Sequence, residues 1–576
     1  MLPIVAPAQF NYATNADGTI TVTGYTGSGG NEAIPDSVDG RRVTAIGGSA
    51  FAGYTNISSV TVPDSVTNIG GYAFNTCSGL TNLTLGNGVT TIGDSAFGGC
   101  SNLASLSIPD GVTSIGYGAF FDCASLTSVS LPDGVTSISK YMFQWCFSLT
   151  NVTLPNAITN ISDFAFQSCL SLPSVAIPNN VTSLGYWVFD GCSSLTNVVI
   201  GNSVSDIGAL AFWGCAALKN VVVPDSVTNI GIYAFSQCTA LTNISLGSGV
   251  LQIGKGAFQD CGALPIILLP TNLISVGDSA FSTCGSLSTA VIPGSVATIG
   301  SGAFSYCANL THITIGDGVA KIGSNAFMNC SGLTSVTIPS TVTNIGREAF
   351  ALCFNLTRVL AGNSISGTTN KGSIGVGAFA QCSNLVVATF ANSFTNIGDF
   401  AFQLCTALTN VSLPNQLKTF GMGVFSECGS LTSIIVPASV ISLSPNLFGH
   451  CTNLTGLYFQ GNAPTVGSST LSGNYNATVY FLPGTSGWGP SYGGRPTSVW
   501  KPVVQTVDGI LGVGTNGFGF NVSWADGCTV VAEASTDPGN SGWSPLQTNT
   551  IVNGSVYFSD PQWTNYPSRY YRVRSP

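Results

Sequence analysis

A phenylalanine followed three residues later by a cysteine recurs every 23 residues through most of this 576-residue chain. The series runs without a break from 74–77 to 350–353. After a six-residue insertion, it resumes at 379–382 and continues to 448–451. Seventeen repeats carry the cysteine, and an eighteenth at the front has Phe51 with Tyr54 in the cysteine position. A fixed period of this length indicates stacked structural units rather than one globular core.

One repeat, residues 333–353 (LTSVTIPSTVTNIGREAFALC), shows what each unit forms. Val336 and Ile338 alternate with Thr337, which predicts a short strand with one buried face. A proline ends this strand because it has no N–H to donate. A second short apolar segment follows, and the spacing of Phe350 and Cys353 predicts one short helical turn with both side chains on the same face. Stacked neighbours would supply the missing walls of the core.

The pattern L-x-x-V-x-I-P-x-x-V-x-x-I-G-x-x-A-F-x-x-C, as in residues 103–123, resembles the BspA-type leucine-rich repeats of bacterial and some protist surface proteins. The resemblance predicts a leucine-rich-repeat solenoid that is mainly β, with about 18 repeats of 23 residues. It implies a secreted or surface-exposed protein that adheres to host or matrix proteins. It carries over no catalytic residue.

The start and the end of the 23-residue period divide the chain into four predicted segments. Residues 1–48 are predicted as an N-terminal cap, which covers the open end of the solenoid. Residues 49–454 hold the repeats, with a surface loop at the insertion. Residues 455–500 are predicted as a C-terminal cap and linker. Residues 501–576 alternate apolar and polar positions between turn residues, which predicts a small antiparallel β-sandwich.

The cysteines of the repeats form one column, so packed and reduced thiols are the favoured interpretation. A strict repeat points these side chains the same way and about one strand spacing apart. Disulfide geometry requires a closer approach of the Cβ atoms. Occasional pairing and a metal-binding column are the alternatives, and Cys528 lies outside the repeats.

Charge and hydropathy exclude several classes of function. Charged residues make up only 7% of the chain and the formal net charge is −9. Nucleic acid is not an expected partner, because phosphate binding needs clustered Lys and Arg. No stretch is long and apolar enough to predict a membrane span. The opening residues lack a complete signal peptide, although 6–9 resemble a cleavage site, so we expect that the signal is trimmed or the start is misplaced, and that the protein is secreted or at the cell surface.

The sequence offers little for catalysis. The only two histidines, His312 and His450, lie six repeats apart, and we expect the first on an exposed strand and the second in a solvated turn. Cys451 adjoins His450 but occupies the buried column. No familiar catalytic, phosphate-binding or zinc motif is present. We therefore expect no enzyme activity, no cofactor and no metal site.

Aromatic residues gather where the repeat consensus has small or polar ones. In five consecutive repeats the residue two before the phenylalanine is bulky, and tryptophans cluster in the same stretch. Exposed aromatic rings anchor protein partners or stack on sugars, whereas the alternative is that they pad adjacent repeats. The candidate binding residues are Tyr141, Trp145, Phe164, Trp187, Trp213 and Tyr233.

These observations favour a non-enzymatic extracellular binding or adhesion protein whose solenoid face binds a protein or glycan. The alternative is a self-associating filament or surface-layer component, because neutral repeats have stackable ends. Ice or mineral binding is disfavoured, since threonine is too irregular along the strands.

Overall fold

The computed structural model describes residues 9–362, 372–506, 509–515, 517–539 and 542–576. The chain divides into two units: 1–367 with 374–385, and 368–373 with 386–576. Residues 6–8 of the expected cleavage site and most of the predicted insertion loop lie outside the described residues.

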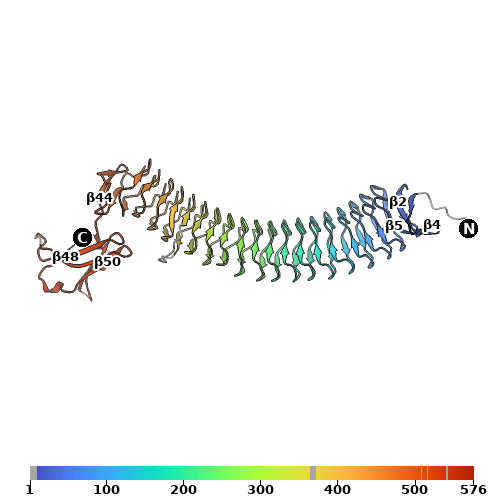
Figure 1. The fold of residues 1–576 in the computed structure, drawn as a ribbon, viewed down its shortest axis with the longest axis horizontal. Helices are drawn as coiled ribbons and strands as arrows, with labels where there is room; N and C mark the ends of the chain where they lie inside the picture. Colours follow the sequence, from blue (N-terminus) through green and yellow to red (C-terminus); the bar gives the residue numbers. More distant parts are fainter. Residues whose placement is uncertain (1–8, 363–371, 507–508, 516, 540–541) are drawn as a thin grey trace. The chain divides into compact units, whose positions relative to one another are not determined.

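The first unit is built from short strands that repeat one above another in parallel ladders (Figure 1). Each 23-residue step contributes one strand to each of two ladders, in register by 23; for example, Asn197, Val198 and Val199 pair with Asn220, Val221 and Val222. The first ladder comprises β3 (Gly30–Ala33), β6 (Ile57–Thr61), β8 (Asn82–Thr84), β10 (Ser105–Ser107), β12 (Ser128–Ser130), β14 (Asn151–Thr153), β16 (Ser174–Ala176), β18 (Asn197–Val199), β20 (Asn220–Val222), β22 (Asn243–Ser245), β24 (Ile266–Leu268), β26 (Thr289–Ile292), β28 (His312–Ile315), β30 (Ser335–Ile338) and β32 (Arg358–Ala361).

The second ladder follows the turn after the proline. It comprises β5 (Arg41–Ile46), β7 (Asn68–Ile69), β9 (Thr91–Ile92), β11 (Ser114–Ile115), β13 (Ser137–Ile138), β15 (Asn160–Ile161), β17 (Ser183–Leu184), β19 (Asp206–Ile207), β21 (Asn229–Ile230), β23 (Gln252–Ile253), β25 (Ser275–Val276), β27 (Thr298–Ile299), β29 (Lys321–Ile322) and β31 (Asn344–Ile345). At the N-terminal end, β1 (Phe10–Thr14) and β2 (Ile20–Tyr25) form an antiparallel pair, β2 joins β5, and β4 (Ser37–Val38) pairs with β5.

The third side of each repeat is a series of consecutive turns. The sequence had predicted one short helical turn in this place. In one repeat Ala73, Asn75 and Cys77 donate their N–H groups to the carbonyl three residues earlier. Tyr72 and Thr76 have left-handed φ angles of 59° and 56°, which a right-handed helix excludes. The phenylalanine and cysteine still face the core together, so the predicted burial is correct although the helix is not.

The phenylalanines form a continuous stack in the first unit. Neighbouring rings from Phe51 to Phe379 are nearly parallel, and the closest centroids, those of Phe51 and Phe74, are 4.7 Å apart. The cysteines form a second column, in which each thiol donates to the phenylalanine carbonyl of the preceding repeat, as Cys100 Sγ does to Phe74 O at 3.2 Å. No disulfide bond joins any of the cysteines, all of which are described. The column therefore packs buried thiols, as the period predicted.

Polar side chains tie the repeats together at the surface. Thr67 and Thr90 donate their hydroxyls to the backbone carbonyl one repeat earlier. The Asp94 carboxylate accepts the Tyr117 N–H of the next repeat at 2.8 Å. These bonds satisfy backbone groups that turns leave without partners.

The second unit continues with the same kinds of ladder. Its strands include β34 (Val387–Phe390), β35 (Phe394–Ile397), β36 (Asn410–Ser412), β37 (Thr419–Phe420), β38 (Ser433–Val436), β39 (Ser442–Leu443), β40 (Gly456–Phe459), β41 (Thr465–Val466), β42 (Thr478–Phe481), β43 (Ser491–Tyr492) and β44 (Arg495–Val499), and β33 (Gly372–Ile374) includes the boundary between the units. Strands β38, β40, β42 and β44 run parallel, so residues expected in a cap and linker extend the ladder, and β43 pairs antiparallel with β44.

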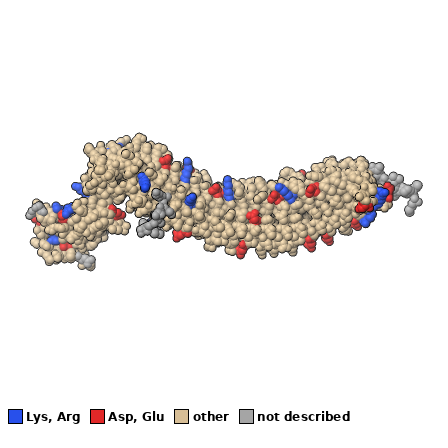
Figure 2. Space-filling model, viewed as in Figure 1, with Lys and Arg blue, Asp and Glu red and all other residues tan. Residues whose placement is uncertain are grey.

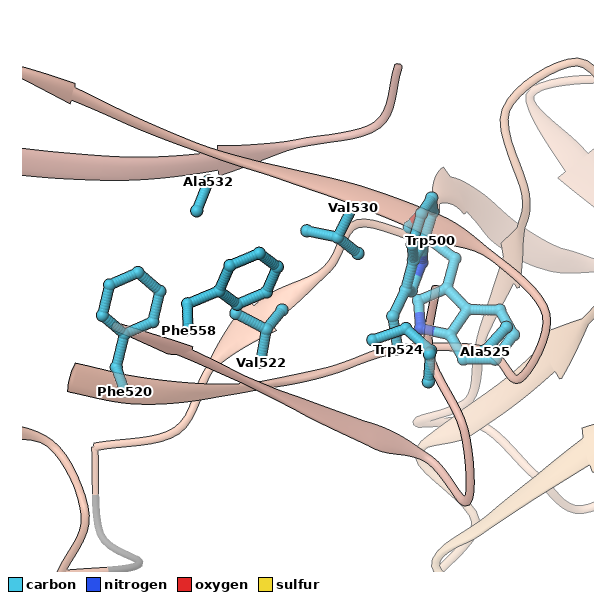
Figure 3. Close-up of a cluster of buried hydrophobic side chains, with 9 residues drawn as sticks. Trp500, Phe520, Val522, Trp524, Ala525, Val530, Ala532 and Phe558 are labelled. Atoms are coloured by element: carbon cyan, nitrogen blue, oxygen red, sulfur yellow. The ribbon is translucent and has the colours of Figure 1, made fainter. Parts of the chain in front are cut away.

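The last segment forms two antiparallel sheets, as the alternation predicted. One contains β45 (Val503–Val504), β46 (Gly512–Gly514), β47 (Gly517–Ser523) and β50 (Ser555–Asp560), and the other β48 (Thr529–Ser535), β49 (Ser544–Thr550) and β51 (Tyr570–Arg574); a 3₁₀ turn spans Trp563–Asn565. Phe520, Val522 and Phe558 face Val530 and Ala532 across the core (Figure 3).

Trp500 joins this core to the last ladder strands of the second unit. Its side chain is buried beside Trp524, whose indole N–H donates to the Trp500 carbonyl at 3.2 Å (Figure 3). Tyr458 and Tyr480 pack against the same cluster. A cut between residues 482 and 501 would therefore divide one hydrophobic cluster.

Candidate functional site

The turn region of every repeat contains a left-handed residue two positions before the core phenylalanine. The small or polar residues Ser95, Gly118 and Ser279 occupy this position with φ angles of 47°, 56° and 54°. Glycine adopts this conformation without steric cost, and a bulky residue there is unusual. The position therefore favours small side chains, as most of the repeats have.

Five consecutive repeats depart from this preference. Their φ angles lie between 54° and 60°, so large side chains sit on backbone that costs about 1–2 kcal/mol for a residue with a Cβ. Strain of this kind persists where other contacts hold it or where the side chain has a role. The five residues are Tyr141, Phe164, Trp187, Leu210 and Tyr233.

Three of these residues stack on one another. The Phe164 ring lies 4.9 Å from that of Tyr141 and 5.9 Å from that of Trp187, with interplanar angles of 20° and 19°. Lys140 Nζ lies 5.2 Å and 5.4 Å from the Tyr141 and Phe164 ring centroids and 3.5 Å from the Asp163 carboxylate. The rings therefore cover each other's faces, and the stack presents mainly edges and a cation to solvent.

Beyond Trp187 the stack is interrupted by Leu210, and a hollow of about 310 Å³ opens there. Trp187, Leu210, Trp213 and Tyr233 form its apolar walls. The Tyr233 ring lies over Gly256, where a Cβ would approach its Cε1 to 2.2 Å. The polar lining consists of Ser236, Gln237, Gln259 and Asp260.

The structure brings five of the six predicted residues into this stack and hollow, and places the sixth apart. Trp145 lies in a neighbouring column with its ring 5.0 Å from that of Phe121, and it is 41% exposed. The other five are half-buried. Because neither Trp145 nor Trp187 is enclosed in the core, both remain available to a ligand.

A buried polar column beside the aromatic residues was not predicted. The Gln144 amide donates to Gln167, and Gln167 Nε2 donates to Asp190 Oδ2 at 2.6 Å. Asp190 is 5% exposed, and its other oxygen has no partner among the described residues. Burial raises the pKa of Asp190, against the lowering effect of the Gln167 hydrogen bond. The sequence signal was a polar residue directly after the core phenylalanine in consecutive repeats.

A second surface, the strand-face groove, runs along the first ladder. One hollow of this groove, about 770 Å³, is lined by Asn197 and Val199 of β18, Asn220 and Val222 of β20, Ser245 of β22, and Asp225. Val199 and Val222 are 55% and 66% exposed. Leu268 and Val291 occupy the same mid-strand position and are also exposed. Further hollows of about 500 and 510 Å³ lie at equivalent positions around β12 and β30.

Over the middle of the face seen in Figure 2, charged side chains are scattered singly. His312 is exposed on β28 and His450 is exposed in a turn, as predicted. Burial raises the pKa of the Cys451 thiol to about 12, so at neutral pH it is protonated and a poor nucleophile. Among the described residues no group of His, Cys, Asp or Glu is arranged to hold a metal ion. These surfaces are equipped for stacking, hydrogen bonding and apolar contact.

The chain belongs to the BspA-type leucine-rich repeat family. The model of the BspA type leucine rich repeat region matches residues 37–146, 115–241, 228–357 and 372–485, which confirms the predicted family and solenoid class. A search of curated proteins finds no match.

Several solved structures are similar to this chain. A leucine rich cell surface protein from Faecalibacterium prausnitzii A2-165 is 27% identical over 71% of this chain and 93% of its own, with a TM-score of 0.35. A leucine-rich repeat protein from Bacteroides ovatus is 22% identical over 83% and 94%, with a TM-score of 0.36. The pneumococcal vaccine antigen PcpA is 18% identical over 67% and 91%, with a TM-score of 0.35. The family assignment rests on the repeats.

No helix within the described ranges has the length and hydrophobicity needed to cross a bilayer.

Proposed function

We propose that this chain is a non-enzymatic binding or adhesion protein, secreted or held at the cell surface, whose solenoid face binds a protein or glycan. The observation that carries this proposal is the strand-face groove, where exposed valines on adjacent strands lie among asparagine and serine side chains. An exposed apolar strip with a polar rim is typical of an interaction surface. Family membership supports the proposal, because this repeat class occurs on bacterial surfaces.

The groove suits a partner that contacts several repeats at once. Each strand adds one equivalent position, such as Val199, Val222, Leu268 or Val291, so contacts accumulate along the ladder. Both histidines are exposed and lie six repeats apart in sequence. The surface is therefore suited to binding, and it is not suited to catalysis by proton transfer between positioned groups.

Replacing Val199 and Val222 with serine is expected to weaken capture of the partner by at least about tenfold, because it removes apolar contact at the centre of the groove. Serine already occupies this mid-strand position at Ser107 and Ser245, so the ladder tolerates it. The measurement is binding of the purified full chain to arrays of matrix proteins and glycans. Surface substitutions of this kind change stability by only about 0.5 kcal/mol.

Ile441→Ser provides the matched control, since Ile441 is 77% exposed but lies in the second unit. Its capture should equal that of the wild type. Unchanged capture by the double variant, with far-ultraviolet circular dichroism intact, would contradict a role for the groove.

Self-association is the second candidate. It is favoured by exposed apolar side chains of the C-terminal segment, among them Val503, Val513 and Val552 at 55%, 62% and 65% exposure. Sizing of the full chain over a concentration series distinguishes the two: a filament-forming protein grows with concentration, and Val513→Ser with Val552→Ser should suppress that growth.

A further inference from the structure

We infer that the hollow walled by Trp187, Trp213 and Tyr233 is a binding subsite for a sugar ring of a neutral glycan. The inference rests on the proposed binding function and goes beyond it by assigning the chemistry of the ligand at one place on the surface. It is separate from the strand-face groove, since the two surfaces share no lining residue.

The hollow interrupts the run of stacked aromatic rings. Phe164 covers one face of Trp187, and Leu210 follows in the column where another aromatic ring would cover the second. The Tyr233 ring packs on Gly256, and among the described residues no aromatic ring stacks on Trp213. Sugar rings present an apolar C–H face that packs on such aromatic surfaces.

Polar groups surround these rings at the places where hydroxyls would project. Ser236, Gln237, Gln259 and Asp260 supply both donors and acceptors. Within the described residues the indole N–H groups of Trp187 and Trp213 have no protein acceptor, and neither nitrogen is among the buried atoms that lack a partner. Both indoles therefore have donors free for solvent or for a ligand, in a site of the mixed apolar and polar kind that small ligands use.

The charge of the hollow selects a neutral ligand. Its described lining includes the Asp260 carboxylate and no Lys or Arg. A sulfated, phosphorylated or sialylated ligand would meet the Asp260 carboxylate, which repels an anion. An uncharged sugar meets only hydrogen-bonding groups.

The backbone shows that folding does not require these side chains. Trp187, Leu210 and Tyr233 have left-handed φ angles of 60°, 55° and 54°, at a position where Ser95 and Ser279 satisfy the same turn in other repeats. Three of the large residues at this position, Trp187, Leu210 and Tyr233, line the hollow. Ligand contact gives a reason for this departure from the repeat that local conformation does not.

Leu210→Phe tests the inference directly, because it extends the stack into the hollow at a backbone position that already accepts Phe164. Calorimetric titration of the full chain with cellohexaose, maltohexaose, mannohexaose and xylohexaose should detect binding of at least one of them by the wild type. Leu210→Phe is expected to weaken that binding by about tenfold or more, and Trp187→Ser, Trp213→Ser and Tyr233→Ser should each weaken it. Leu210→Ser keeps the space open and should retain binding.

Tyr72→Ser is the matched control, since Tyr72 occupies the same turn position with a φ of 59° far from the hollow in sequence. Its affinity for the sugar should equal that of the wild type. Two results would overturn the inference: no binding of any of the four sugars, or binding that survives Leu210→Phe and the three serine variants. In either case capture by the strand-face groove is tested separately by the Val199 and Val222 variants, so the proposed function could stand while this subsite is rejected.

Discussion

Phe235→Ala is expected to lower the free energy of unfolding of its region by about 3–5 kcal/mol, because truncating a buried phenylalanine leaves a cavity. The Phe235 side chain is fully buried, with ring centroids 5.1 Å from Phe212 and 5.4 Å from Phe258. The backbone around it is held by the bond from Phe235 N to Ala257 O at 2.8 Å. Neighbouring repeats have little freedom to collapse into the vacated space.

The damage should remain regional. Repeats contact mainly their neighbours, so stability is close to a sum of local terms and interfaces. Hydrogen exchange measured along the full chain should show faster exchange around β19 to β23, with β6 and β48 unchanged. Val222→Ala, which alters an exposed side chain of the same repeat, should change exchange little. Uniform acceleration throughout the chain would show that the repeats unfold as one cooperative block instead.

The sequence predicted the core because the core is strictly periodic. Each Phe and Cys position meets the same neighbours one repeat away, so one consensus determines burial everywhere, as at Phe97 and Cys100. Alternation of apolar and polar residues predicted the short strands of the repeats and the antiparallel C-terminal sheets. The predicted helical turn failed because spacing alone does not reveal the sign of φ, and left-handed residues such as Tyr72 and Thr76 interrupt it.

The candidate hollow was only partly predictable. Bulky residues at an otherwise small position identified Trp187 and Tyr233, but their stacking depends on ring orientation across repeats. The contribution of Leu210 to the hollow depends on its neighbours in adjacent repeats, so the sequence alone does not indicate it. The Gln167 to Asp190 bond joins residues 23 positions apart and becomes evident only when the repeats are aligned by structure.

The cysteine column should be inert to alkylation in the native chain. Burial raises the pKa of the thiols, to about 11 at Cys77 and about 12 at Cys238 and Cys307, so little thiolate forms at pH 8. Iodoacetamide followed by mass spectrometry should label Cys528, which is half-buried outside the column, before any column residue. All should react in urea.

The same burial predicts a loss of stability at alkaline pH. A thiol whose pKa is about 9 in the unfolded chain and about 12 in the folded chain stays protonated to a higher pH when the chain is folded. Its stabilising contribution is complete below pH 9 and disappears as the pH rises through 12. For one such thiol the difference corresponds to about 4 kcal/mol. Many column thiols are raised in the same direction, so their losses add within one pH window.

Urea unfolding measured from neutral pH upward should therefore give a constant free energy until about pH 9 and a steep decline above it. Cys238→Ser with Cys307→Ser keeps a hydroxyl donor for the carbonyls of Phe212 and Phe281 and removes two titrating thiols. This variant is expected to be less stable at neutral pH, because hydroxyls are costlier to bury than thiols, yet its decline should be shallower by up to about 1.4 kcal/mol per pH unit for each thiol removed. Asn474 supports the substitution, since its amide makes the same bond to Phe448 O at 2.6 Å in the column position of its own turn. Equal slopes for the variant and the wild type would mean that the thiols do not titrate on unfolding, and the alkaline limit of the fold would then lie with tyrosines such as Tyr492, whose pKa burial also raises.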